Sequence, residues 1–183
     1  VFLRMVLPIF IIPLIGTFVT GMAVYYIIGD PIAGMMKWLS AWLANMQGVS
    51  FIILGGILGC MIAVDMGGPM NKTAFFFAVA LISTNPQLMA AVAAADCTPP
   101  LGLALATFMF KGIFNDVERE AGKPAIIMGF MGITEGAIPF AAADPVRVIP
   151  AIMLGSAVAA ISSLWFGATN AAPWGGLIVL PVV

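Results

Sequence analysis

The sequence predicts an all-α integral membrane protein with several spans and with broken or re-entrant helical segments, an architecture typical of transporters. Hydrophobic residues make up 62% of the 183 residues and charged residues only 8%, whereas soluble domains carry roughly 25% charge. Long uncharged runs alternate with short Gly- and Pro-containing breaks. The whole chain is therefore expected to form one membrane-embedded domain over residues 1–183, with the lipid bilayer around it.

The charge balance excludes several classes of function. Seven basic and eight acidic residues leave a net charge of −1, so no basic face is expected for nucleic acid. The chain has no histidine, which argues against zinc, haem and histidine-based acid/base chemistry. Cys60 and Cys97 stand alone in apolar sequence and are interpreted as small buried hydrophobes. No metal and no cofactor are expected.

The first two elements differ in character. Residues 5–28 are uncharged and long enough to cross a hydrocarbon core of about 30 Å; prolines inside the run argue against a cleaved signal peptide. Residues 31–48 are predicted to form an amphipathic helix in the membrane interface, with its tryptophans at headgroup level. Its apolar face is formed by Met35, Trp38, Leu39, Trp42 and Leu43.

The middle of the chain contains shorter apolar blocks. Residues 51–64 are too few for an untilted span, residues 73–95 are interrupted at Asn85-Pro86, and residues 101–110 follow the sequence DCTPP at 96–100. Because proline and glycine interrupt helices, we expect breaks at these places. Residues 111–123 carry three basic and three acidic residues and are predicted to be a water-facing loop.

The C-terminal third is predicted to contain a re-entrant substrate-site segment at residues 124–145, a span at 148–165, a turn at 167–173 and a final apolar run. Glu135 lies inside the re-entrant segment. A charge at membrane depth costs roughly 2.5–3.5 kcal/mol even on lenient insertion scales, so it normally faces a protein interior or a watery cavity. In total about five spans are expected, with one or two broken segments.

Two broken segments share one layout. Asp65 and Glu135 each follow a Gly-containing apolar run, and each has a proline four residues later, Pro69 and Pro139, with glycine between. Glycine and proline unwind a helix and free backbone groups that a cavity, water or a polar ligand must then satisfy. The pattern indicates a binding site at membrane depth.

A neutral polyhydroxyl ligand would suit the polar residues available. Carboxylates accept from hydroxyls, an amide such as Asn71 donates and accepts, and an aromatic face such as Trp174 packs on C–H groups. Plainer interpretations remain open: an Asp65–Lys72 ion pair at a helix end, or Glu135 held by backbone N–H groups. Asn170 and Trp174 are further candidates for sugar contact, although a turn asparagine and an interfacial tryptophan need no ligand to explain them.

Asp144 and Arg147 stand three residues apart at the expected start of a helix. For this pair an N-cap and a local charge pair are favoured over a binding role.

Four stretches carry a family resemblance over nearly the whole chain: AVDMGGPMNKTAFFFAVAL, CTPPLGLALATFMF, EREAGKPAIIMGFMGITEGAIPFAAADPVRVIPAIMLGSA and AAPWGGLIVLP. In this order they resemble the membrane IIC component of fructose-type (fructose/mannitol-like) phosphotransferase system sugar permeases. The resemblance implies uptake of a sugar across the bacterial inner membrane by a multi-pass protein, coupled to its phosphorylation.

The resemblance also implies partners. The phosphoryl donor would be a phosphocysteine on a IIB domain, in the same or a separate chain, because neither cysteine here lies in a IIB-like loop and the histidine of a IIA domain is absent. Similar permeases form homodimers. The chain would thus supply the transport and sugar-binding part of a phosphotransferase complex.

Site residues follow from the motifs. In similar permeases the glutamate of ITEGAIPF contacts the sugar hydroxyl that becomes phosphorylated; here it is Glu135, the expected catalytic base, flanked by Thr134. Thr98 and Pro99 are weaker candidates for the wall of the site. The DMGGP-NK element is expected on the opposite wall and comprises Asp65, Gly67, Gly68, Pro69, Asn71 and Lys72.

Two features depart from the family pattern. Trp174 stands in APWGG where the family shows a histidine in APHGG, so a mannosyl compound or another hexose is expected as readily as fructose. The chain is also about half as long as the family domain and is expected to be a fragment. The rival hypothesis is an ion-coupled secondary transporter that uses Asp65 and Glu135 as proton or cation sites. A membrane scaffold without transport would leave both carboxylates without a role.

Overall fold

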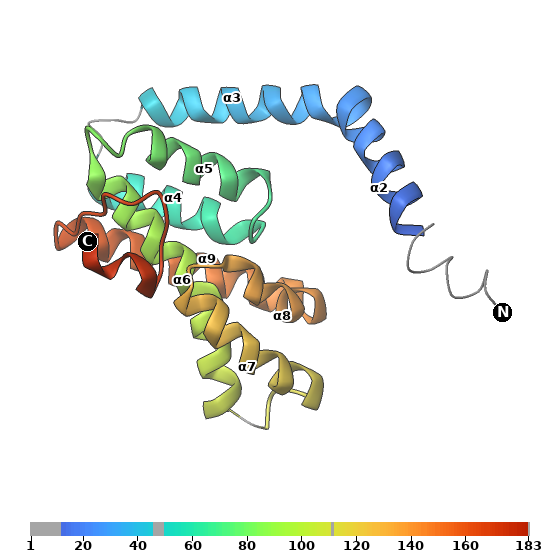
Figure 1. Cartoon of the computed structure of the whole chain (residues 1–183). Coiled ribbons are helices and arrows are strands. Elements are labelled where there is room, and N and C mark those ends of the chain that lie inside the picture. The colour runs from blue at the N-terminus through green and yellow to red at the C-terminus, as the bar shows by residue number, and fades with distance from the viewer. Residues whose placement is uncertain (1–11, 46–49, 111, 183) are drawn as a thin grey trace. The chain divides into compact units, whose positions relative to one another are not determined.

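The computed structural model describes residues 12–45, 50–110 and 112–182, and all regular secondary structure in those ranges is helical (Figure 1). The chain forms two compact units, residues 1–41 and residues 42–183, which are described one at a time. The helical content and the apolar helices confirm the predicted all-α membrane class.

In the first unit, helix α2, Ile12–Ala23, continues through a π-helical turn, Val24–Ile28, into α3, Gly29–Asn45, whose last four residues belong to the second unit. The axis bends by 56° between Pro13–Ile27 and Gly29–Met35. The predicted amphipathic helix is therefore helical as far as Asn45, and its place in a lipid interface stays a prediction. Residues 5–11 of the predicted first span and residues 46–48 lie outside the described residues.

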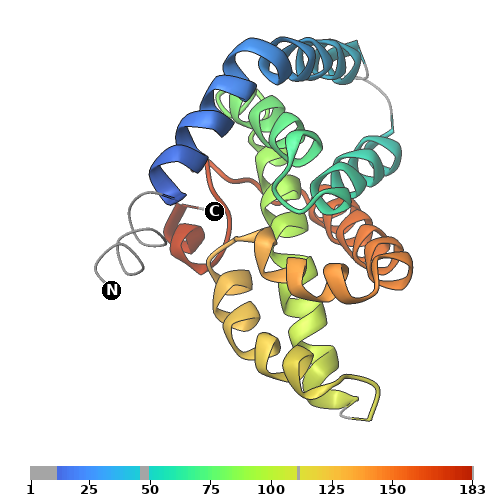
Figure 2. The same cartoon turned by 90° about the vertical axis from the view of Figure 1, so that its right-hand side faces the viewer.

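The second unit is built around one long helix, α6, which contacts most of the other helices (Figures 1 and 2). Helix α7 runs beside the C-terminal half of α6, and α4 packs against α9. The elements are α4, Phe51–Val64; α5, Pro69–Ala80; α6, Pro86–Met109; α7, Asp116–Phe130; a 3-10 turn, Thr134–Ala137; α8, Ile138–Ala143; α9, Pro145–Trp165; and a 3-10 helix, Leu177–Val182.

Glycine permits the close packing of α4 on α9. A Cβ atom at Gly59 would lie 2.6 Å from the backbone nitrogen of Ala157, and one at Gly55 would lie 3.2 Å from the backbone of Ile161. Because lipid gives helices no hydrophobic drive to associate, small residues at such crossings let the backbones approach and gain dispersion contacts. The pair α4–α9 is thereby fixed as one wall of the unit.

Helix α6 continues through Pro99 and Pro100, so the break expected at residues 96–100 is absent and that prediction is wrong. Proline lacks an N–H, and Pro99 therefore cannot donate to the carbonyl of Ala95. The hydroxyl of Ser156, fully buried on α9, donates to this carbonyl instead at 3.0 Å. A neighbouring helix thus satisfies the group that the proline frees.

The predicted loop at 111–123 is also corrected, because residues 116–123 form the first half of α7. Asn115 accepts from the backbone N–H of Glu118 at 2.9 Å, and the Glu118 carboxylate accepts from the N–H of Asn115 at 2.8 Å. This capping box satisfies free donors at the helix start. The charges that suggested a loop lie on the exposed side of the helix, where Lys123 pairs with Glu120 at 2.7 Å.

Fewer long spans occur than expected. Among the described residues two helices are long and apolar enough to cross a membrane, Pro86–Met109 and Pro145–Trp165, or three if the bent pair Pro13–Ile27 and Gly29–Met35 counts as one. The other apolar runs fold as shorter pieces, such as the 14 residues of α4. Residues 124–145 form the end of α7, a turn, the 3-10 turn and α8, a broken segment whose re-entrant character stays a prediction.

Candidate functional site

The two broken motifs meet in space. The Lys72 ammonium on α5 lies 3.6 Å from a carboxylate oxygen of Glu135 in the 3-10 turn, and their side chains are 44% and 39% exposed. The ion pair considered for Asp65 and Lys72 is therefore replaced by a pair that joins segments 63 residues apart in sequence (135 − 72). The tertiary fold thus brings DMGGPMNK and GITEG to one place.

Asp65 builds the turn that places Lys72. Its two carboxylate oxygens accept from the backbone N–H groups of Met70 at 2.7 Å and Asn71 at 3.0 Å. These are free donors at the start of α5, where Pro69 takes the first turn without needing an N–H. Asp65 is therefore a capping residue in this structure, and it does not line the cleft described below.

Gly67 fits directly against Glu135. Its φ of +107° is a conformation that favours glycine, and a Cβ atom there would lie 2.8 Å from the Glu135 carboxyl carbon. Gly68 is equally close to Asp65, because a Cβ atom at this position would lie 2.7 Å from the Asp65 carboxyl carbon. Both glycines therefore shape the turn around the two acids without offering side chains to a ligand.

A buried network supports the same place from behind. The hydroxyl of Thr134 donates to an oxygen of Asp96 at 2.7 Å, and the amide of Asn71 lies 3.4 Å from both Asp96 and Thr134. The same amide donates to the carbonyl of Ile62 at 2.7 Å. All three side chains of the network are at most 5% exposed. Asn71 and Thr134 thus hold the two motifs together.

Sequence reasoning missed Asp96. The sequence DCTPP suggested a break between apolar blocks, so its acid was not considered as a site residue. The signal that singled out Glu135 was present here as well, because Asp96 is also a lone carboxylate inside apolar sequence.

A cleft of about 620 Å³ opens at this place, within the roughly 300–1,000 Å³ of small-molecule pockets. Its lining includes two carboxylates, one ammonium and three aromatic side chains, the combination of hydrogen-bonding groups and apolar faces that a sugar needs. The lining residues are Lys72, Phe75, Phe76, Val79, Asp96, Gly132, Ile133, Thr134, Glu135, Pro173 and Trp174.

Trp174 is fixed at the edge of this cleft. Its indole N–H donates to the carbonyl of Met131 at 2.8 Å, and its ring meets Phe75 edge-on with centroids 6.0 Å apart. Asn170 is 1% exposed and holds the loop, accepting from the N–H of Ala172 and donating to the carbonyl of Trp174. Asn170 therefore positions Trp174 and lies outside the cleft.

Two further predicted wall residues also lie elsewhere. Thr98 donates to the carbonyl of Ala94 and packs towards α9, where a Cβ at Gly155 would lie 3.3 Å from its methyl group. Pro99 is fully buried in α6, and neither residue lines the cleft. At the start of α9, the Asp144 side chain accepts from the N–H of Arg147, as an N-cap does.

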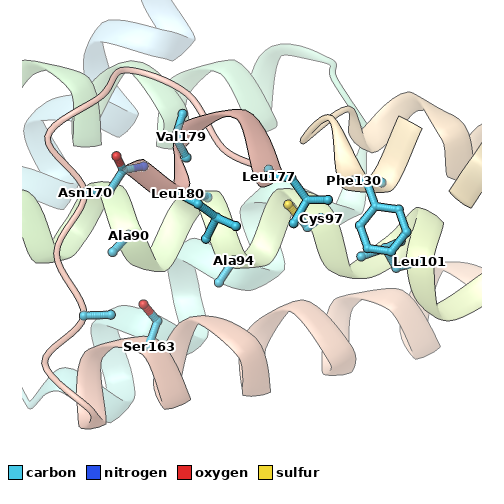
Figure 3. A pocket seen from close by; sticks show the side chains of 14 residues that line it. Ala90, Ala94, Cys97, Leu101, Phe130, Ser163, Asn170, Leu177, Val179 and Leu180 are labelled. Carbon is cyan, nitrogen blue, oxygen red and sulfur yellow. The ribbon is translucent and has the colours of Figure 1, made fainter. Parts of the chain in front are cut away.

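A second pocket of about 350 Å³ lies between α6, α9 and the C-terminal segment, with Asn170 towards one end and Phe130 towards the other (Figure 3). Its lining is almost entirely apolar and holds no carboxylate or amine, so it offers a sugar few partners. Cys97 lines it and Cys60 lies in α4; both are partly buried free thiols. Within the described ranges no group of three or more metal-ligating residues occurs.

Comparison with known proteins agrees with these features. The family described as phosphotransferase system, EIIC, matches residues 2–155. The chain is 49% identical, over 99% of its length, to the fructose-like permease IIC component 2 of Escherichia coli K12 and covers 51% of that protein. It is 47% identical to the fructose permease IIC component of Bacillus amyloliquefaciens, over 94% of its length and 57% of the relative's.

Relatives in larger proteins match the same region. The fructose-specific EIIB'BC component of Xanthomonas campestris is 48% identical over 94% of this chain and 30% of the relative. No solved structure matches the chain. The chain thus spans about half the length of the two IIC relatives from Escherichia coli and Bacillus amyloliquefaciens. Its family and its apolar helices place it in the bacterial inner membrane. The resemblance found in the motifs is confirmed, and the chain belongs to the EIIC family of the phosphotransferase system.

Proposed function

We propose that this chain forms the sugar-binding part of a permease that takes up a hexose or hexose derivative while a IIB domain phosphorylates it. The observation that carries the proposal is the contact of Lys72 with Glu135 inside a cleft that also has an aromatic wall. A cation beside a carboxylate and next to an apolar face suits phosphoryl transfer to a sugar hydroxyl.

The names of two relatives support the partner. The Xanthomonas campestris protein is an EIIB'BC component, and a Bacillus subtilis relative, 46% identical over 94% of this chain, is an EIIABC component. In each name a B and a C component belong to one protein. We infer that the partner of this chain is a phosphorylated IIB domain, in the same or a separate chain, and that the permease is a homodimer.

Glu135 is proposed as the base. A sugar hydroxyl is a weak nucleophile, and a carboxylate that takes its proton typically contributes 10²–10⁴-fold to such a step. The sugar oxygen forms a bond to phosphorus as the phosphorus–sulfur bond to the IIB cysteine breaks; the proton goes to Glu135, and the cysteine leaves as thiolate. Lys72, whose ammonium lies 3.6 Å from Glu135, is proposed to balance negative charge on the transferred group.

The aromatic wall is proposed to recognise the apolar C–H face of the sugar. The rings of Trp174 and Phe75, which both line the cleft, meet edge to face with an interplanar angle of 75°. A tryptophan stacks on a sugar face but cannot replace the second nitrogen that a histidine would offer. We infer that the permease prefers a hexose or mannosyl derivative whose binding uses a stacking face.

The ion-coupled alternative is less well supported. In the form that uses Asp65 and Glu135 it needs both carboxylates free, but both oxygens of Asp65 are occupied by backbone N–H groups of α5. Glu135 carries a lysine within 3.6 Å, which occupies the place of a coupling cation.

The test is phosphorylation of sugars by membranes that contain the full-length permease. The membranes are supplied with phosphoenolpyruvate and the general phosphotransferase proteins, and fructose, mannose, mannitol and mannosyl glycosides are offered separately. We expect a sugar phosphate from at least one of them. Accumulation of unmodified solute that depends on an ion gradient, without any sugar phosphate, would support the ion-coupled transporter instead.

A further inference from the structure

We infer that Asp96 is a second sugar-binding carboxylate of this site, whose outer oxygen accepts a hydrogen bond from a substrate hydroxyl other than the one that is phosphorylated. The inference rests on the proposed function and adds a residue that sequence patterns did not reveal. Asp96 lies on α6, is 5% exposed and lines the same cleft as Glu135 and Lys72.

The two oxygens of Asp96 have different surroundings. Oδ1 accepts the hydroxyl proton of Thr134 at 2.7 Å and receives the amide of Asn71 at 3.4 Å. The structure shows no donor to Oδ2 among the described residues. Every fully buried polar side-chain atom in those ranges has a hydrogen-bond partner, so Oδ2 is not fully buried. Oδ2 therefore reaches the open space of the cleft.

A purely supporting role would not need a carboxylate. One acceptor oxygen satisfies both Thr134 and Asn71, and the side-chain oxygen of an asparagine could supply it. Burying a charged group instead costs several kcal/mol unless its partners compensate. The second oxygen thus gains its use when a ligand donates a hydrogen bond to it.

The chemistry of the cleft fits a neutral ligand with several hydroxyls. Its formal charges are those of Asp96, Glu135 and Lys72, which sum to −1. A carboxylate accepts only, so the groups facing Asp96 and Glu135 must be donors, and sugar hydroxyls provide two of them. Because Asp96 holds Thr134, the residue before Glu135, the bond to the second hydroxyl also orients the sugar relative to the base.

The test combines Asp96→Asn in the full-length permease with monodeoxy derivatives of the sugar that the wild type phosphorylates fastest. In the wild type, removal of one hydroxyl other than the phosphorylated one should lower kcat/KM about 10- to 100-fold, the range of a hydrogen bond to a charged group. Asp96→Asn should lower kcat/KM for the parent sugar by a similar factor, mainly through KM. In Asp96→Asn, kcat/KM for the parent sugar and kcat/KM for that deoxy analogue should then agree within about threefold, so that the penalty for the missing hydroxyl disappears.

A structural role would give another pattern. If Asp96 only holds Thr134, Asp96→Asn should change activity little, because the asparagine oxygen still accepts from Thr134. Thr134→Val should then lower activity on the parent sugar and on every deoxy analogue in parallel, and in both variants the loss caused by each missing hydroxyl should stay as in the wild type. That result would overturn the inference. Equilibrium binding of radiolabelled parent and deoxy sugars, measured without IIB, must show the same change of penalties.

Two controls separate the causes of failure. Asp144→Asn also removes a carboxylate, but at the start of α9 and outside the cleft, and should leave every deoxy penalty unchanged. The deoxy analogue itself checks folding, because Asp96→Asn should use it about as well as the wild type does. Failure of the wild type to phosphorylate any sugar would contradict the proposed function, whereas an active wild type with unchanged penalties in Asp96→Asn would contradict only this inference.

Discussion

Glu135 has its surroundings set by residues from two other segments. Gly67 lies against its carboxylate from the turn before α5, and Lys72 pairs with it from the first turns of α5. The neighbouring Thr134 is anchored to Asp96 on α6. The position of the proposed base is therefore fixed by contacts between motifs, and single substitutions at these contacts should affect catalysis and folding differently.

Replacement of Glu135 by glutamine should separate binding from chemistry. Glu135→Gln keeps the size and much of the hydrogen bonding but removes the base, so phosphorylation should fall about 10²–10⁴-fold while sugar binding is partly retained. Single-turnover transfer from phosphorylated IIB and equilibrium sugar binding would measure the two effects. Glu120→Gln, on the exposed side of α7, is the control; unchanged phosphorylation in Glu135→Gln would remove Glu135 from the mechanism.

Gly67→Ala should displace Glu135 by steric clash and by backbone strain, without removing any functional group. The added Cβ would meet the Glu135 carboxylate, and the φ of +107° is strained for alanine. We expect phosphorylation to fall by at least about tenfold, because displacement of a catalytic group by an ångström can cost more than that. Gly102→Ala is the matched control, since apart from the neighbouring backbone of its own helix no atom lies within 4 Å of its Cβ position. Equal activity of both variants would show that Glu135 does not need this contact.

The sequence pointed to sugar-binding residues through charge placed in apolar sequence, and the role of these residues in binding stays a prediction. Glu135 and Lys72 line the cleft as expected, whereas Asp65, Thr98 and Asn170 serve the local backbone instead. The sequence shows that a polar residue is out of place, but the groups that satisfy it are decided by neighbours. Backbone N–H groups at the start of α5 donate to Asp65, and a backbone N–H group of the loop donates to Asn170, so these side-chain oxygens are already hydrogen-bonded without a ligand.

At the scale of elements, α6 shows how a helix with two adjacent prolines is kept continuous. The carbonyl that Pro99 leaves free in α6 receives the hydroxyl of Ser156 from α9. The two prolines do remove backbone N–H donors from the helix, but a hydroxyl from α9, 61 residues away in sequence, donates to the carbonyl that is left without its N–H partner. Asp96 was hidden by the same circumstance, because the residues around it read as a turn.

This compensation can be measured with a double-mutant cycle. Ser156→Ala alone should lower the free energy of unfolding by about 1–2 kcal/mol, because a buried carbonyl loses its donor. In the background of Pro99→Ala, which restores an N–H to the helix, the same change should cost much less. Thermal unfolding in detergent would give the coupling; purely additive effects would show that Ser156 does not act through the carbonyl that Pro99 frees.

For the whole molecule, the proposed coupling of transport to phosphorylation makes uptake independent of ion gradients. In membrane vesicles that contain the full-length permease and internal phosphoenolpyruvate with the phosphotransferase proteins, uptake should persist when an uncoupler collapses the proton gradient. The accumulated product should be sugar phosphate, which cannot leave by the same route in reverse. Uptake that stops with the uncoupler and delivers free sugar would contradict the proposal.

The amino-acid sequence by itself determined the class, the family and the two motifs of this protein. An apolar composition with few charges requires a lipid environment, and the motifs are contiguous stretches that can be recognised along the chain. The tertiary structure alone decided that Lys72 pairs with Glu135, that Asp96 joins the same cleft and that Asp65 does not. It also decided that α6 stays intact and that residues 116–123 are helical. The physical reason is that hydrogen-bond partners of buried polar groups are chosen by proximity in space, which sequence spacing does not encode.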